Sequence, residues 1–458
     1  MRVRRERGGP ALGFTGLFGR FQHPGQVVVG VFALTILIGT LLLKMPVSTD
    51  TPGSVDWLTA LFTATSAVCV TGLVVVDTAS TWSTFGEVVI ALLFQAGGLG
   101  IMTLGTLFAL LVSGRLGLRA RLLAQAESKA LGTPNLRRVV RNVVLFTLTI
   151  EAMAAIVLTV RFATAYDHDL GRAIYLGAFH SMSAFNNAGF ALWPDSLVRF
   201  ATDPWICLTI ALAVLAGALG FPVVFELWRQ WRHPRRWSVL TRITVGVTAV
   251  LLVAGTLIFL ATEWNNPRTM GPLADWDKLL ASFFLTVMRT GGFNTVDLSQ
   301  LNPSSWLVSD LLMFIGGGSA STAGGIKVTS LGLVIFMVWT EMRGYADVNI
   351  GHRQIPATAQ RQAIAITLLG VSLVAISTYL LVVISPHALD QVLFEAISAF
   401  GTVGMSLGIT AGLPAAGQLL LIVLMFIGRT GPLTLGSALA LRERDRRYVL
   451  PQEHLIVG

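Results

Sequence analysis

The sequence predicts an all-α protein that crosses a membrane several times. Of its 458 residues, 53% are hydrophobic and only 12% are charged, whereas about 25% of the residues in a typical soluble domain are charged. Apolar runs of roughly 20 residues, long enough to span a bilayer as helices, recur along the chain. In addition, a short motif containing glycine follows alternate apolar runs.

Eight apolar runs are expected to be spanning helices. The basic residues near the N-terminus and the apolar run from Val27 to Leu43 resemble a secretory signal. No small-residue cleavage site follows that run, so we interpret it as a retained first helix. The expected spans are residues 28–47, 88–113, 142–163, 204–228, 243–262, 306–340, 364–384 and 416–440.

The positions of the basic residues predict the orientation of these spans. With the N-terminus in the cytoplasm, 24 of the 33 Lys and Arg residues fall on the cytoplasmic side and five on the external side. This is the positive-inside pattern of membrane proteins. It predicts a multi-pass protein of the cell inner (plasma) membrane with two cytoplasmic tails, at residues 1–27 and 442–458. Cys69 and Cys207 lie in apolar stretches and indicate neither a disulfide framework nor a cysteine metal site.

A further apolar segment, residues 54–76, does not fit this pattern as a span. If it crossed the membrane, the strongly basic loop 114–141 would face outside. We therefore expect the segment to enter from outside, turn at Val70-Thr71-Gly72-Leu73 and return near Asp77. An irregular backbone at that depth is tolerated only where it is buried in protein or lines a water-filled cavity.

The same arrangement recurs about every 110 residues, after the first, third, fifth and seventh spans. It predicts four fused helix–pore-loop–helix repeats around a pseudo-fourfold axis, with eight spanning helices and four re-entrant pore helices. The expected repeats are residues 28–141, 142–242, 243–363 and 364–441. A single glycine in a membrane helix is usually a packing contact, but four at even spacing favour re-entrant hairpins.

Four such turns around one axis would place short backbone segments side by side. Their carbonyl oxygens can replace the hydration shell of a monovalent cation, and glycine permits the backbone angles that this requires. Neutral side chains in all four segments favour K⁺ over a divalent cation. The candidate K⁺ selectivity filter is Val70, Thr71, Gly72, Leu73, Asn187, Ala188, Gly189, Phe190, Thr290, Gly291, Gly292, Phe293, Thr402, Val403, Gly404 and Met405.

The segments TSAVCVTGL, MSAFNNAGF, VMRTGGFNT and SAFGTVGMS resemble those of the Trk/Ktr/HKT superfamily of potassium transporters. The resemblance covers nearly the entire chain. Because only one span precedes the first hairpin, the chain is similar to Ktr-type membrane subunits. Gly291 departs from the alanine that is often found there, and only the fourth segment keeps a channel-like Thr-Val-Gly order. The strictness of K⁺ over Na⁺ selection therefore stays open.

The sixth span contains the glycine-rich stretch FIGGGSASTAGGIKVTS, residues 314–330. Five glycines make a straight helix costly, so a kinked, closely packed helix is one interpretation. The resemblance implies an intramembrane gate loop beneath the filter. The candidate gate residues are Gly316, Gly317, Gly318, Ser319, Thr322, Gly324, Gly325, Lys327 and Arg429. Arg429 is expected to face the pore or pair with loop carbonyls, and Lys327 either lies beside the ion path or extends to the cytoplasmic interface.

Three other polar residues in or near the spans are expected to be structural. Glu151 and Asp310 are interpreted as packing or interface residues, and His180 as a hydrogen-bonded histidine close to the second filter segment. Gly97, Gly98 and Gly100 predict a mild kink in the second span.

The sequence contains no nucleotide-binding fingerprint or catalytic constellation, so we predict no enzyme activity, no organic cofactor and no nucleic-acid partner. The resemblance implies K⁺ as the transported ion and leaves Na⁺ activation open. It also implies a homodimer, partly through the C-terminal tail, and a cytosolic ring of regulatory subunits that bind ATP and ADP. A less selective K⁺/Na⁺ pathway and a proton-coupled Trk-type symporter are the alternatives within transport. An intramembrane enzyme would need paired acids, a histidine cluster or an activated nucleophile, and a membrane scaffold would not need four filter segments.

Overall fold

The computed structural model describes residues 24–51, 53, 55–114, 136–345, 347–351 and 353–441. Residues 1–23 of the expected N-terminal tail, most of the first basic loop and the expected C-terminal tail at 442–458 lie outside the described residues.

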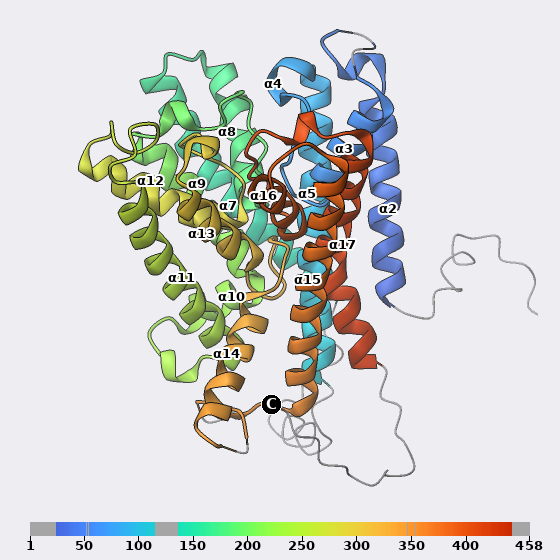
Figure 1. The fold of residues 1–458 in the computed structure, drawn as a ribbon, viewed down its shortest axis with the longest axis vertical. Coiled ribbons are helices and arrows are strands. Elements are labelled where there is room, and N and C mark those ends of the chain that lie inside the picture. The colour runs from blue at the N-terminus through green and yellow to red at the C-terminus, as the bar shows by residue number, and fades with distance from the viewer. Residues whose placement is uncertain are drawn as a thin grey trace, which may run out of the picture.

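Long helices run side by side along the longest axis of the molecule (Figure 1). Four helices of the described part are long and apolar enough to cross a membrane, and a fifth qualifies if one bent pair counts as a single span. The fold is therefore all-α, as predicted. The long helices are α2 (Pro24–Leu43), α5 (Thr84–Gly114), α7 (Leu136–Ala165), α11 (Val239–Glu263), α15 (Ala357–Ile384) and α17 (Ala415–Leu441).

Four shorter helices occupy the upper half of the molecule in Figure 1. With 12 to 16 residues each, they are too short to span a bilayer. The side chain of Asp56 caps the first of them by accepting a hydrogen bond from Thr59 N, and Asp169 caps the second through Arg172 N. These helices are α3 (Trp57–Val68), α8 (Leu170–Phe185), α12 (Asp275–Val287) and α16 (Leu389–Gly401).

Each short helix packs against the helix that precedes it in the chain and against at least one other helix. Helix α3 contacts α2 and α5, α8 contacts α7 and α9 (Pro204–Leu219), and α16 contacts α15 and α17. Helix α12 packs on α11 and α9. Because α17 also contacts α2 and α3, the last part of the described chain lies against the first.

The fourth expected span, residues 204–228, is wrong as a single straight helix. The chain leaves α9 at Gly220 and turns by 102° into α10 (Phe221–Gln230). Gly220 has a φ of +85°, a conformation that glycine adopts without strain. Pro222 then occupies the first turn of α10, where its missing N–H costs nothing.

The sixth expected span is also interrupted. Helix α13 (Pro303–Phe314) ends where the glycine-rich stretch begins, and α14 (Val328–Met342) starts after it. Residues 315–327 form a non-helical loop, which we call the gate loop, in which Gly316 N donates to Ile326 O at 2.7 Å. The interpretation of this stretch as a continuous kinked helix is therefore wrong. In contrast, α5 continues through Gly97, Gly98 and Gly100 without interruption.

The remaining elements are connections. Strands β1 (Asn349–Ile350) and β2 (Arg353–Gln354) form a small antiparallel pair between α14 and α15. Short helical turns join the other parts: η1 (Pro46–Ser48), α4 (Thr78–Thr81), η2 (Val198–Phe200), η3 (Pro234–Arg236), η4 (Met288–Thr290), η5 (Leu298–Gln300) and η6 (Thr410–Gly412).

Candidate functional site

The four predicted filter segments follow the carboxyl ends of the short helices, and each contains one glycine in the left-handed region. The φ angles are +89° at Gly72, +70° at Gly189, +74° at Gly292 and +96° at Gly404. Any other residue would be strained at these positions.

These glycines bring the four segments into direct contact as a closed ring. A Cβ added at Gly72 would collide with the carbonyl oxygen of Ala188, and one at Gly404 would collide with that of Thr71. The other two contacts follow the same rule, from Gly189 to Gly291 O and from Gly292 to Val403 O. Each segment therefore touches the next along the chain, and the fourth closes on the first.

The backbone before the glycine is alike in three segments and different in the third. Val70, Asn187 and Thr402 have φ angles of +57°, +60° and +49°. In the third segment η4 prolongs α12, and Gly292 N donates to Met288 O at 3.1 Å. The ring is thus imperfectly fourfold in its backbone as well as in its side chains.

Hydroxyl side chains of the short helices form hydrogen bonds with the backbone of these turns. The sequence analysis did not single them out. Ser66 Oγ accepts a hydrogen bond from Gly72 N at 3.1 Å, and Ser398 Oγ accepts one from Gly404 N at the same distance. In the second segment, Ser183 Oγ donates to Phe190 O at 2.8 Å. The available signal was a Ser or Thr six residues before each glycine.

His180 and Glu395 support the second and fourth segments in equivalent ways. Leu192 N donates to His180 Nε2 at 3.2 Å, and Leu407 N donates to Glu395 Oε1 at 3.3 Å. The His180 proton therefore resides on Nδ1, which faces Leu176 O at 2.8 Å. His180 has the structural environment that was expected of it, whereas Glu395 was not anticipated.

Glu395 is fully buried and accepts two further hydrogen bonds, from Ser406 Oγ and from Thr410 Oγ1 (3.0 Å). Glu151 has a similar bridging place: Gln95 Nε2 and Asn186 Nδ2 both donate to it at 3.1 Å, which connects α7, α5 and the end of α8. Asp310 is buried in α13, and its Oδ1 has no hydrogen-bond partner among the described residues.

The gate loop is hydrogen-bonded directly to the ring. Thr322 Oγ1 donates to Asn187 Oδ1 at 2.7 Å, and Asn187 Nδ2 donates to Thr290 Oγ1 at 3.0 Å. A side chain at Gly324 would collide with Thr402 Oγ1, so the loop also lies against the fourth segment. The loop therefore contacts the second and fourth segments directly, and Asn187 connects it to the third through Thr290.

Buried arginines hold the gate loop through its carbonyl oxygens. Arg429 Nη1 donates to Thr322 O and Arg429 Nη2 donates to Gly97 O at 3.3 Å, so α17 ties the loop to α5. Arg289, which the sequence analysis missed, donates to Ile315 O and to Gly316 O (3.2 Å).

The other candidate gate residues lie within the loop. Lys327 Nζ donates to Ala323 O at 2.5 Å, so its ammonium group is directed back onto the loop rather than extended away from it. Ser319 Oγ is 2.9 Å from Thr329 Oγ1. Gly316, Gly317, Gly318 and Gly325 make close backbone contacts within the loop or with its neighbours.

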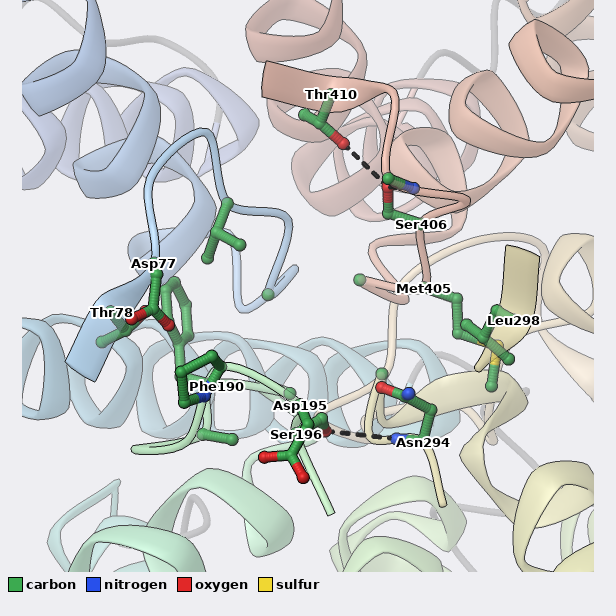
Figure 2. Close-up of a pocket in the computed structure, with 18 of the residues that line it drawn as sticks. Asp77, Thr78, Phe190, Asp195, Ser196, Asn294, Leu298, Met405, Ser406 and Thr410 are labelled. Atoms are coloured by element: carbon green, nitrogen blue, oxygen red, sulfur yellow. Dashed lines mark hydrogen bonds between the residues drawn. The ribbon is translucent and has the colours of Figure 1, made fainter. Parts of the chain in front are cut away.

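On the side opposite the gate loop, the ring opens into a vestibule of about 570 Å³ lined by all four segments (Figure 2). Asp77, Asp195 and Asp297 line this space. Partial burial acts to raise the pKa of Asp195, but hydrogen bonds from Arg199 outweigh that effect and hold the pKa below its ordinary value. Asp195 is therefore negatively charged at neutral pH.

A ring of backbone segments between a vestibule and a loop, set within apolar helices, defines a membrane transport protein. Comparisons with known proteins agree. A family model described as "TrkH: Cation transport protein" matches residues 17–446. The chain belongs to this family, which confirms that it is a transporter and not an enzyme.

Two curated relatives are similar over almost their whole length. The Ktr system potassium uptake protein B of Bacillus subtilis is 39% identical over 94% of this chain and 96% of the relative, and that of Vibrio alginolyticus is 38% identical over 94% of each. In a crystal structure, the potassium transporter TrkH from Vibrio parahaemolyticus has the same fold, with a TM-score of 0.70 at 18% identity over 90% of this chain and 83% of that one.

Proposed function

We propose that this chain is the ion-translocating membrane subunit of a potassium uptake system. The observation that carries the proposal is the closed ring of Gly72, Gly189, Gly292 and Gly404, in which each glycine abuts the carbonyl of the next segment. Carbonyl oxygens from four segments around one axis are suited to replacing the hydration shell of K⁺. The names of its relatives, which are potassium uptake proteins, support this assignment.

The gate loop is proposed to obstruct the ion path below the ring and to move on activation. Its hydrogen bonds to Asn187 and to Arg429 support this role, because they link it both to the ring and to α17. A cytosolic nucleotide-binding subunit is proposed to control the loop. The word "system" in the relatives' names supports a multi-subunit assembly.

The remaining expectations are proposals of the same kind. They are a homodimer in the plasma membrane with cytoplasmic termini, four repeats with the bounds given above, and activation by Na⁺.

Uptake of ⁸⁶Rb⁺ into proteoliposomes, with the regulatory partner and nucleotide present, tests the main proposal. We expect uptake that excess K⁺ abolishes and that equal Na⁺ inhibits weakly. Absence of uptake under these conditions, in protein shown to be folded, would refute the proposal.

A less selective K⁺/Na⁺ pathway is the second candidate. The different backbone of the third segment favours it, because η4 replaces the left-handed turn found in the other three. Comparable ²²Na⁺ and ⁸⁶Rb⁺ uptake in the same vesicles would select this alternative.

A further inference from the structure

A second cavity, remote from the ring, lies between α7 and α10. Its volume is about 850 Å³, within the range of roughly 300–1,000 Å³ that is typical of ligand pockets. It is lined by three aromatic residues of α10, by Trp231 directly after that helix, and by apolar residues of α7 such as Leu145 and Phe146. The aromatic residues are Phe221, Phe225, Trp228 and Trp231.

The geometry of α10 is that of a helix lying along a membrane surface. It departs from α9 by 102° and lies below α9 in Figure 1. Trp228 is 81% exposed and Trp231 is 64% exposed. Tryptophan is enriched at membrane–water interfaces, and amphipathic helices with aromatic and basic residues lie in that plane.

Arginines directly follow the two lining tryptophans in the chain, and the guanidinium group of Arg232 lies 4.8 Å from the centre of the Trp231 ring. Arg229 is in the last turn of α10 and Arg232 follows the end of that helix. Arg141 is an exposed residue of α7 next to Asn142, which lines the groove. None of them is in an ion pair with a described residue. Glu226, the acidic residue of α10, is occupied by hydrogen bonds from Ser238 N (2.7 Å) and Ser238 Oγ (2.6 Å).

We infer that this groove binds an anionic phospholipid of the cytoplasmic leaflet, with an acyl chain among the aromatic residues and the headgroup phosphate at Arg229 and Arg232. A second copy of this chain would cover the aromatic residues but leave the arginines without counter-charges. A water-soluble protein partner would satisfy the arginines but not the apolar groove. An anionic lipid matches both parts of the site.

The site is connected to the gate loop through the bend at Gly220, so lipid binding is expected to change gating. This step rests on the proposed function. Gly318 N donates to Ala218 O at 2.7 Å, and Thr322 N donates to Gly217 O at 3.2 Å. Both carbonyls are in the last turn of α9, directly before the bend. A displacement of α10 therefore reaches the loop through two backbone hydrogen bonds.

The test measures quenching of tryptophan fluorescence in the full-length protein by phosphatidylglycerol with brominated acyl chains, against brominated phosphatidylcholine. We expect stronger quenching by phosphatidylglycerol than by phosphatidylcholine. This excess should disappear in Trp228→Phe/Trp231→Phe, because the other nine of the 11 tryptophans do not line the groove. In Arg229→Gln/Arg232→Gln the preference for phosphatidylglycerol should fall about fivefold per arginine. The matched control is Arg343→Gln/Arg361→Gln, which removes two exposed arginines outside the groove, one directly after α14 and one in α15. It should leave the preference unchanged.

Uptake of ⁸⁶Rb⁺ is then compared in vesicles with and without phosphatidylglycerol. We expect the lipid to change uptake by the wild type and by the control, but not by Arg229→Gln/Arg232→Gln. Equal quenching by the two lipids would overturn the site. So would arginine variants that keep the preference for phosphatidylglycerol but no longer bind the cytosolic partner. Lipid-selective quenching without uptake in any variant would support the site and contradict the proposed transport function instead.

Discussion

Gly72 is restricted in two separate ways, by its positive φ and by the carbonyl of Ala188 where a Cβ would lie. We predict that Gly72→Ser lowers the apparent affinity for K⁺ or the K⁺/Na⁺ discrimination about tenfold. The change forces a strained backbone, at a cost of about 1–2 kcal/mol, and moves a carbonyl of the next segment. Competition of K⁺ and Na⁺ with ⁸⁶Rb⁺ uptake measures the effect.

Gly53→Ser is the matched control, because Gly53 has a φ of +81° but no atom within 4 Å of an added Cβ. It imposes the same backbone strain without a steric collision. If both variants change selectivity equally, or if Gly72→Ser only reduces the amount of folded protein, the ring contact does not determine ion selection.

Glu395 accepts a hydrogen bond from Leu407 N, three residues after the fourth glycine. Its removal should therefore change ion selectivity as well as the stability of the fold. We predict that Glu395→Ala destabilises the protein by about 1–3 kcal/mol, because the buried donors of Leu407 and Thr410 lose their acceptor. Thermal unfolding in detergent and the ratio of ⁸⁶Rb⁺ to ²²Na⁺ uptake are the measurements.

Glu395→Gln keeps one acceptor oxygen and should retain part of the selectivity. A purely structural role predicts lost stability with an unchanged uptake ratio in both variants, which would contradict a positioning role.

For single residues, the sequence predicted which positions form the ring. It did not identify the side chains that form hydrogen bonds with the backbone of the ring segments. The spacing of four glycines located residues such as Val70 and Thr402 because a repeated unit repeats its turn. Ser66 and Glu395 act on backbone groups six and twelve residues later. Those distances become contacts only after the hairpin has folded. The Ser or Thr that recurs six residues before each glycine is a pattern in the sequence, but by itself it does not show that the hydroxyl supports the turn.

Among the elements, the gate loop depends on Arg429 for its connection to α5. We predict that Arg429→Ala raises ⁸⁶Rb⁺ uptake in the absence of the regulatory partner, because Thr322 O and Gly97 O lose their common donor and the loop is released. The comparison with wild type uses equal amounts of reconstituted protein.

Arg429→Lys can reach only one of the two carbonyls, so we expect an intermediate rate. Basal uptake and nucleotide response that match wild type in Arg429→Ala would show that the arginine does not restrain the loop.

Hydropathy alone did not predict where some helices end. The run 204–228 is apolar enough to be a single span, but the order Gly220-Phe221-Pro222 favours a turn followed by a new helix. For the glycine-rich stretch, composition predicted only that a straight helix would be costly, and the family resemblance implied the loop. Its attachment to Ala218 was not predicted, since that contact joins residues 100 positions apart in the chain.

For the whole molecule, the acidic vestibule should concentrate cations at the entrance. We predict that Asp77→Asn/Asp297→Asn raises the KM for ⁸⁶Rb⁺ about tenfold at low ionic strength and much less at high salt. Asparagine also caps helices well, so the caps that these aspartates provide for α4 and η5 are kept.

The control is Asp275→Asn, which removes an exposed acid of α12 that does not line the vestibule. An equal rise in KM for the control, or a rise that persists at high salt, would exclude local concentration of cations as the cause.

The contact of α17 with α2 and α3 joins the part of the chain that carries the fourth ring segment to the part that carries the first by packing alone, whereas the peptide chain connects the other three pairs of successive segments. The circle therefore has no structural beginning. A circularly permuted chain that starts before a different ring segment would present the same four glycines in the same cyclic order. If the chain were expressed as two separate halves, these would have to form two non-covalent interfaces. The native protein already contains one of them, the contact of α17 with α2 and α3.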